Sequence, residues 1–130
     1  LQKRRAAESA AALEASAEMG LPVLIGSSKQ IARASTIRLA ALPLIDGAVA
    51  ALTTRIQAEF HGFPVEAQAE VADALALIGT EMRAQTASDW WITECNADRY
   101  TIECRVLDVL RKRLQFLAPT AYAAYREENR

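Results

Sequence analysis

The 130-residue chain has few residues of the kinds that bind metals, with one histidine and two cysteines. His61 precedes a glycine in a loop-like stretch, and Cys95 and Cys104 lack the Cys-x-x-Cys spacing of zinc sites. No Glu-x-x-His pair, the motif that builds di-iron sites in helical bundles, is present. The sequence therefore predicts neither a metal site nor a bound cofactor.

The small number of histidines and cysteines also limits catalysis. A cysteine nucleophile needs a base beside it, and His61 is the only histidine that Cys95 or Cys104 could use. Nothing in the neighbouring sequence supports that pairing, so a thiol enzyme is the least favoured hypothesis and no catalytic residue is assigned. On one straight helix the two cysteines would lie roughly 13 Å apart along the axis, too far for a disulfide. We expect reduced thiols.

Residues that favour strands and turns are also scarce. Aromatic residues make up 6% of the chain, and there are five glycines and four prolines. No segment alternates polar and apolar residues as a half-buried strand does, whereas alanine, leucine, glutamate and arginine favour helices. Because short loops between successive helices imply antiparallel neighbours, we predict an all-α fold, an antiparallel bundle of four to five helices.

Apolar periodicity and breaking residues locate the helices. The expected helices span residues 2–19, 27–60, 65–86 and 97–117, with a short helix after Pro119. Pro43 should kink the second helix because proline removes a backbone donor, and Ser88 is a predicted cap. The alanine-rich segment 1–20 is expected to attach loosely to a bundle domain formed by residues 21–130.

Charge of either sign is not in excess, since the formal net charge is −1. That balance argues against binding nucleic acid or membranes through bulk charge. No uninterrupted apolar run reaches transmembrane length, so we expect a cytoplasmic protein without a membrane partner. Lys3, Arg4 and Arg5 are interpreted as a solvated leader.

Local basic clusters could still contact phosphates. The run Arg111–Arg113 lies near the end of a predicted helix, where cations also complement the helix dipole. The candidate nucleic-acid contacts are Lys29, Arg33, Arg105, Arg111, Lys112 and Arg113.

The stretch GSSKQIARA, residues 26–34, resembles a phosphate-binding loop at first sight. Its glycine spacing does not fit a P-loop, because five residues separate Gly20 from Gly26. Ser27 followed three residues later by Gln30 is instead the pattern of a capping box. We predict that these two residues start the second helix.

Arg38 falls on the apolar side of that helix when the sequence is drawn on a helical wheel. A buried guanidinium needs a carboxylate or an aromatic face. We predict a clasp between Arg38 and the SDWWITE segment, with partners drawn from Asp89, Trp90, Trp91 and Glu94. The alternative is that the Arg38 head reaches solvent while its stem covers apolar atoms.

The segments 21–38, LPVLIGSSKQIARASTIR, and 88–92, SDWWI, resemble a short module of largely uncharacterised bacterial, phage and plasmid proteins. That module reads approximately LPxLxGSxKQIxWAxxIR, followed much later by WWI. Arg33 departs from it, since the module usually has tryptophan there. The resemblance covers a minority of the chain, and its association with mobile elements implies an accessory role near DNA or RNA.

The sequence thus predicts a non-enzymatic helical module. One hypothesis is a nucleic-acid-associated accessory protein that uses the basic residues named above. The other is a protein-interaction or homo-oligomerisation module, because a small domain with thin apolar faces could need a second copy, as in a homodimer, to bury enough surface.

Overall fold

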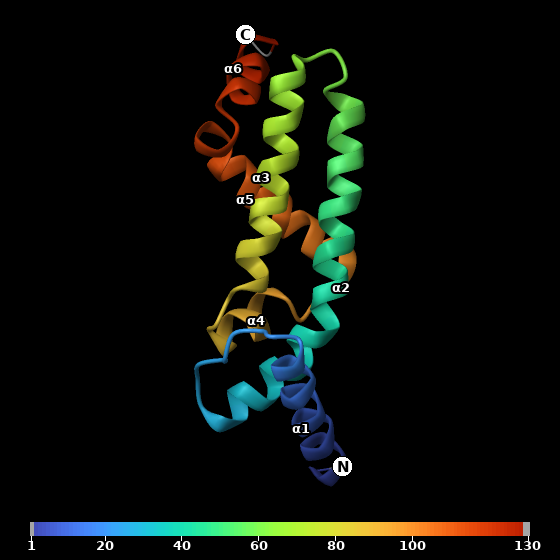
Figure 1. The fold of residues 1–130 in the computed structure, drawn as a ribbon, viewed down its shortest axis with the longest axis vertical. Coiled ribbons are helices and arrows are strands. Elements are labelled where there is room, and N and C mark those ends of the chain that lie inside the picture. The colour runs from blue at the N-terminus through green and yellow to red at the C-terminus, as the bar shows by residue number, and fades with distance from the viewer. Residues whose placement is uncertain (1, 129–130) are drawn as a thin grey trace.

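The computed structural model describes residues 2–128, and within them the chain is all-helical, without a strand. Six helices follow one another: α1 (Gln2–Glu18), α2 (Ser28–Glu59), α3 (Val65–Arg83), α4 (Ser88–Glu94), α5 (Arg99–Leu117) and α6 (Pro119–Glu128). Figure 1 shows α2 and α3 side by side along the long axis, with α1 near one end and α6 near the other. Residues 1, 129 and 130, at the outer ends of the two expected domains, lie outside the described part.

α1 ends at a glycine and packs on α2. Gly20 adopts a left-handed conformation with φ 70°, and the Leu21 amide donates to the Ser16 carbonyl, which is the pattern of a helix-terminating Schellman turn. Ala12 and Ser16, one turn apart, are buried. The contacts of α1 are mainly with the first turns of α2, so this helix lies on the bundle along one narrow face.

α2 starts with the predicted capping box. The Gln30 amide donates to Ser27 Oγ at 3.2 Å, and the Ser27 amide donates to Gln30 Oε1 at 3.0 Å. Pro43 lies inside α2, which continues through it to Glu59.

α2 is also long and apolar enough to cross a membrane by length and composition alone, a test that core helices of soluble proteins also pass. The expectation that no apolar stretch reaches transmembrane length is therefore wrong for α2.

The α2–α3 hairpin closes around two phenylalanines. Phe60 and Phe63 pack edge to face with ring centroids 4.3 Å apart, a favoured geometry for aromatic pairs. Further along, Gly79 of α3 faces Val49 of α2 so closely that an added Cβ would lie 3.1 Å from a valine methyl. The two long helices therefore approach each other through a small residue.

The core lies where α5 and α4 cover α2 and α3. Its largest fully buried apolar side chains are Ile45, Leu52, Leu75, Ile78, Trp91, Ile102 and Val106. α6 packs against α3, where the Glu70 carboxylate accepts the Thr120 amide at 2.8 Å. A carboxylate at a helix N-terminus complements the helix dipole, so Glu70 helps to fix the start of α6 at Pro119.

The predicted all-α fold is confirmed, and the segment around the tryptophans forms a separate short helix, α4. The cap predicted at Ser88 is wrong. Ala87 occupies the N-cap of α4 without a side-chain cap, and Ser88 is buried with its Oγ lacking a hydrogen-bond partner. Packing against Gly26 explains this, since a Cβ on that glycine would lie 3.1 Å from Ser88 Cβ.

Candidate functional site

The basic residues predicted to contact nucleic acid fall in two places, on α5 and in the first turns of α2. On α5, three of the four already pair with carboxylates: Arg105 with Glu94, Lys112 with Asp108, and Arg113 with Glu81. Arg113 makes two hydrogen bonds to Glu81. These bonds raise the pKa of Arg113 and lower the pKa of Glu81.

Arg111 is the exception on α5, because it is exposed and forms no ion pair with any residue in the range 2–128. Its neighbours Lys112 and Arg113 each sit beside a carboxylate of opposite charge. The α5 run therefore presents much less free positive charge than its sequence suggests.

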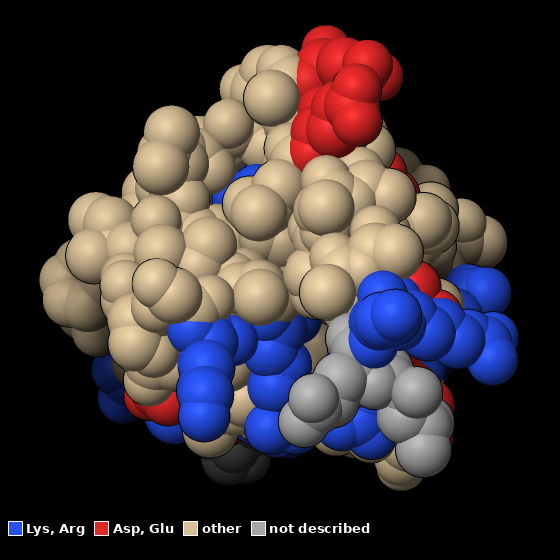
Figure 2. Space-filling model, turned by 90° about the horizontal axis from the view of Figure 1, so that it is seen from below, with Lys and Arg blue, Asp and Glu red and all other residues tan. Residues whose placement is uncertain are grey.

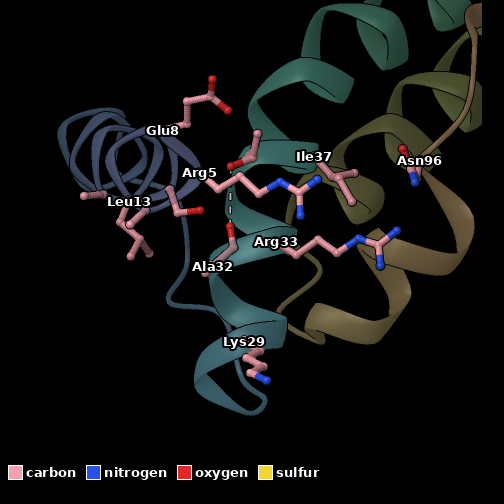
Figure 3. A pocket seen from close by; sticks show the side chains of 12 residues that line it. Arg5, Glu8, Leu13, Lys29, Ala32, Arg33, Ile37 and Asn96 are labelled. Atoms are coloured by element: carbon pink, nitrogen blue, oxygen red, sulfur yellow. Dashed lines mark hydrogen bonds between the residues drawn. The ribbon is translucent and has the colours of Figure 1, made fainter. Parts of the chain in front are cut away.

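The α2 residues line a groove instead. Lys29 and Arg33 border a cavity of about 1130 Å³ together with Arg5 of α1 and Asn96 of the α4–α5 loop. Figure 3 shows the Arg5 and Arg33 side chains extending in the same direction from two helices, with Lys29 one turn nearer the start of α2. None of these three basic residues forms an ion pair within the described chain.

Small and apolar residues also line the groove. They are Ala6, Ala10, Leu13, Ala32 and Ile37. Ser9 and Thr36 add hydroxyl groups, and Thr36 donates to the Ala32 carbonyl. The one carboxylate among the lining residues is that of Glu8, which pairs with Arg4 at 3.2 Å. The groove thus offers three unpaired cations and little opposing charge.

The surroundings of the groove are basic as well. Figure 2 views the molecule from the end that carries α1, and lysine and arginine side chains spread across one half of that face, with a red acidic patch at the opposite edge. Lys3, Arg4 and Arg5 are all exposed. Arg5 is also a lining residue of the groove, because α1 packs on α2 and brings it beside Arg33.

Arg38 is fully enclosed, with 2% of its surface exposed, so the alternative in which its head reaches solvent is wrong. Its Nη1 donates to the Pro22 carbonyl at 2.7 Å, while Nε has no partner. No ion pair joins it to Asp89 or Glu94 among the described residues, and Glu94 pairs with Arg105. Desolvation lowers the pKa of Arg38. The two predicted carboxylate partners are therefore incorrect.

Arg38 instead binds the connector between α1 and α2, through the Pro22 carbonyl. Ile25 of the same connector makes two backbone hydrogen bonds to the α3–α4 segment. The Ile25 amide donates to the Thr86 carbonyl at 2.7 Å, and the Ser88 amide donates to the Ile25 carbonyl at 3.0 Å. Gly26 then turns into α2 with φ 153°, in the region that favours glycine. The two segments that carry the resemblance thus lie together.

Both tryptophans belong to this structural contact. Trp91 is fully buried, and its indole Nε1 donates to the Gln85 carbonyl at 2.9 Å. Trp90 is partly buried and packs edge to face on Trp91 with centroids 4.9 Å apart. Neither ring lines the groove, so the tryptophans stabilise the fold around α4.

The cysteines and the histidine are separated. Cys95 is buried and Cys104 is exposed, and both are free thiols. Burial raises the pKa of the Cys95 thiol to about 11, which disfavours the thiolate that a nucleophile needs. His61 lies in the α2–α3 loop, at the opposite end of the long axis from α4 in Figure 1. The geometry therefore brings no imidazole to Cys95.

No group of three or more histidine, cysteine, aspartate or glutamate residues is placed to hold a metal ion within residues 2–128. In comparisons with known proteins, the chain matches no protein-family model, no curated protein and no solved structure. The groove between α1 and α2 is thus the candidate site, defined by Arg5, Lys29 and Arg33.

Proposed function

We propose that the chain is a non-enzymatic helical module that binds nucleic acid through phosphate contacts in the α1–α2 groove. The observation that carries this proposal is the convergence of Arg5, Lys29 and Arg33 from two helices on one groove, with no ion pair to neutralise them among residues 2–128. Arginine and lysine contacts to phosphates supply most of the sequence-independent affinity for nucleic acids.

A local cluster can bind a polyanion although the net charge of the chain is −1. Salt screens charges more than about 10 Å away at 0.1 M ionic strength, so a bound phosphate responds mainly to the cations beside it. The groove supplies three such cations, whereas Arg105, Lys112 and Arg113 would first have to leave their carboxylates. This difference favours the groove over α5 as the binding surface.

Fluorescence anisotropy with labelled DNA and RNA tests the proposal. The groove variant Arg5→Gln, Lys29→Gln, Arg33→Gln should lose roughly tenfold in affinity per contact at 0.1 M salt. A control set on α2 and α5, Arg55→Gln, Arg111→Gln, Lys112→Gln, removes the same charge from exposed residues away from the groove. Circular dichroism checks that both variants fold.

The control variant separates a specific groove from an effect of total charge. We expect the control variant to bind with nearly the affinity of the unmodified chain. Equal losses in the two sets would show that only total charge matters, and a larger loss in the control set would place the contacts among Arg55, Arg111 and Lys112. Absence of binding by the unmodified chain to any DNA or RNA at low salt would refute the proposal.

A protein-interaction or homo-oligomeric module is the second candidate, favoured by exposed apolar side chains. Val23 and Ile25 of the connector are 85% and 68% exposed, and Phe116 of α5 is 79% exposed. Light scattering across a range of concentrations tests self-association. A Phe116→Ser variant should dissociate an oligomer held by that side chain, and a monomer at every concentration would refute the oligomeric form.

We also infer that the five helices of ten or more residues form the bundle, and that the short helix α4 connects α3 to α5. We further infer that α2 bends at Pro43. Proline lacks an amide hydrogen, so the Leu39 carbonyl has no helical donor. Hydrogen exchange of residues 39–43 should slow in Pro43→Ala, where the missing bond is restored.

The cytoplasmic location and the role as an accessory protein of mobile elements stay predictions of the sequence.

A further inference from the structure

The lining of the groove bears on which form of nucleic acid it takes. None of its twelve described lining residues is aromatic. Proteins that bind single strands without sequence preference stack bases on aromatic side chains, and each stacked base contributes about 1–3 kcal/mol. The nearest tryptophans cannot substitute, because Trp91 is fully buried and Trp90 packs on it. The groove therefore has no platform for an unpaired base.

The lining also has little that could read a base edge. Sequence readout in the major groove uses side chains such as arginine or asparagine carried into the groove by a helix or a strand pair. Here Arg5 and Arg33 lie along a groove whose lining includes several small residues. Asn96 is the only side-chain amide among the lining residues of the described chain, and it belongs to a loop. This arrangement suits a sugar-phosphate strand better than a base.

An electrostatic site of this kind discriminates by charge density. A duplex carries one negative charge per roughly 1.7 Å of its axis. The logarithm of its binding constant falls by about 0.9 per phosphate contact for each tenfold rise in salt concentration. For a single strand the corresponding fall is about 0.7. The groove offers three contacts, one for each cation. If the two forms bind equally at 1 M salt, the difference in slope makes binding of the duplex about fourfold tighter at 0.1 M salt.

We infer that the groove between α1 and α2 binds the phosphate backbone of double-stranded nucleic acid without base preference, with Arg5, Lys29 and Arg33 as the contacts. This inference rests on the proposed function and narrows its ligand to the duplex. One strand of the duplex lies along the groove, and the small lining residues let it approach the two helices.

A competition experiment with four ligands tests the inference. The ligands are a labelled 20-base-pair DNA duplex, its two separated strands made unable to self-pair, and a second duplex of the opposite base composition. We expect both duplexes to bind within about twofold of each other and about fourfold more tightly than either strand at 0.1 M salt. The triple groove variant should lose this preference along with most of its affinity.

The outcomes separate the inference from the proposed function. Single strands that bind as tightly as the duplex, or that stay bound at 0.5 M salt, would overturn the duplex inference while leaving nucleic-acid binding intact. A difference of tenfold or more between the two duplexes would overturn the absence of base preference. Failure of all four ligands to bind would overturn the proposed function itself.

Discussion

Trp91 provides the sharpest test of how the fold is held together. Its side chain is fully buried between α4 and the long helices, and its indole donates to the Gln85 carbonyl. A buried tryptophan removes 150–250 Å² from water, which at about 25 cal/mol per Å² gives roughly 4–6 kcal/mol as an upper estimate. Measured Trp→Ala changes in cores cost about 3–5 kcal/mol.

We therefore expect Trp91→Ala to lower the free energy of unfolding by about 3–5 kcal/mol. Trp90→Ala is the matched control, because that ring is only partly buried, and its loss should be smaller by about 1 kcal/mol or more. Urea unfolding followed by circular dichroism gives both values by linear extrapolation. A loss below about 1 kcal/mol at Trp91, or a larger loss at Trp90, would refute the packing described for α4.

Four further tests probe the start of α2 and the thiols. Ser27→Ala removes the N-cap of α2 and should cost about 1 kcal/mol in thermal or urea unfolding, and an unchanged midpoint would contradict the capping box. Gly26→Ala should destabilise because the backbone has φ 153° and the new Cβ would meet Ser88, so a stabilised variant would contradict the close approach. At pH 8 a thiol reagent should modify Cys104 and spare Cys95 in the folded chain, and equal rates would show that Cys95 is accessible. Burial raises the Cys95 pKa from 9.0 to about 11. The protonated Cys95 thiol therefore contributes its full stabilisation below pH 9, and that contribution falls by roughly 1.4 kcal/mol per pH unit between pH 9 and pH 11. In a Cys95→Ala variant, this part of the loss of stability at alkaline pH should be absent.

Local sequence signals were sufficient for five of the six helices and for the start of α2. The capping box depends on residues three positions apart, Gly20 marks the end of α1, and Pro119 marks the start of α6. Such signals act within one or two turns of the chain, so the sequence carries them without knowledge of the fold. The short helix α4 was missed as a separate element because seven residues are too few to show a period.

The partners of charged residues depend on tertiary structure and were not predictable. Arg38 was correctly placed on the buried side of α2, but its partner is a backbone carbonyl 16 residues away, and no residue type marks a carbonyl acceptor. Arg113, a predicted nucleic-acid contact, pairs with Glu81, which is 32 residues away in the sequence. Arg5 joins the groove only because α1 folds back onto α2.

The salt dependence of duplex binding tests the central claim most directly. The logarithm of the binding constant is measured against the logarithm of salt concentration for the unmodified chain and for Arg5→Gln, Lys29→Gln, Arg33→Gln. The account predicts that the slope becomes shallower by about 3 in the variant, since each lost phosphate contact removes about 1. An unchanged slope would contradict the assignment of the groove as the phosphate-binding site.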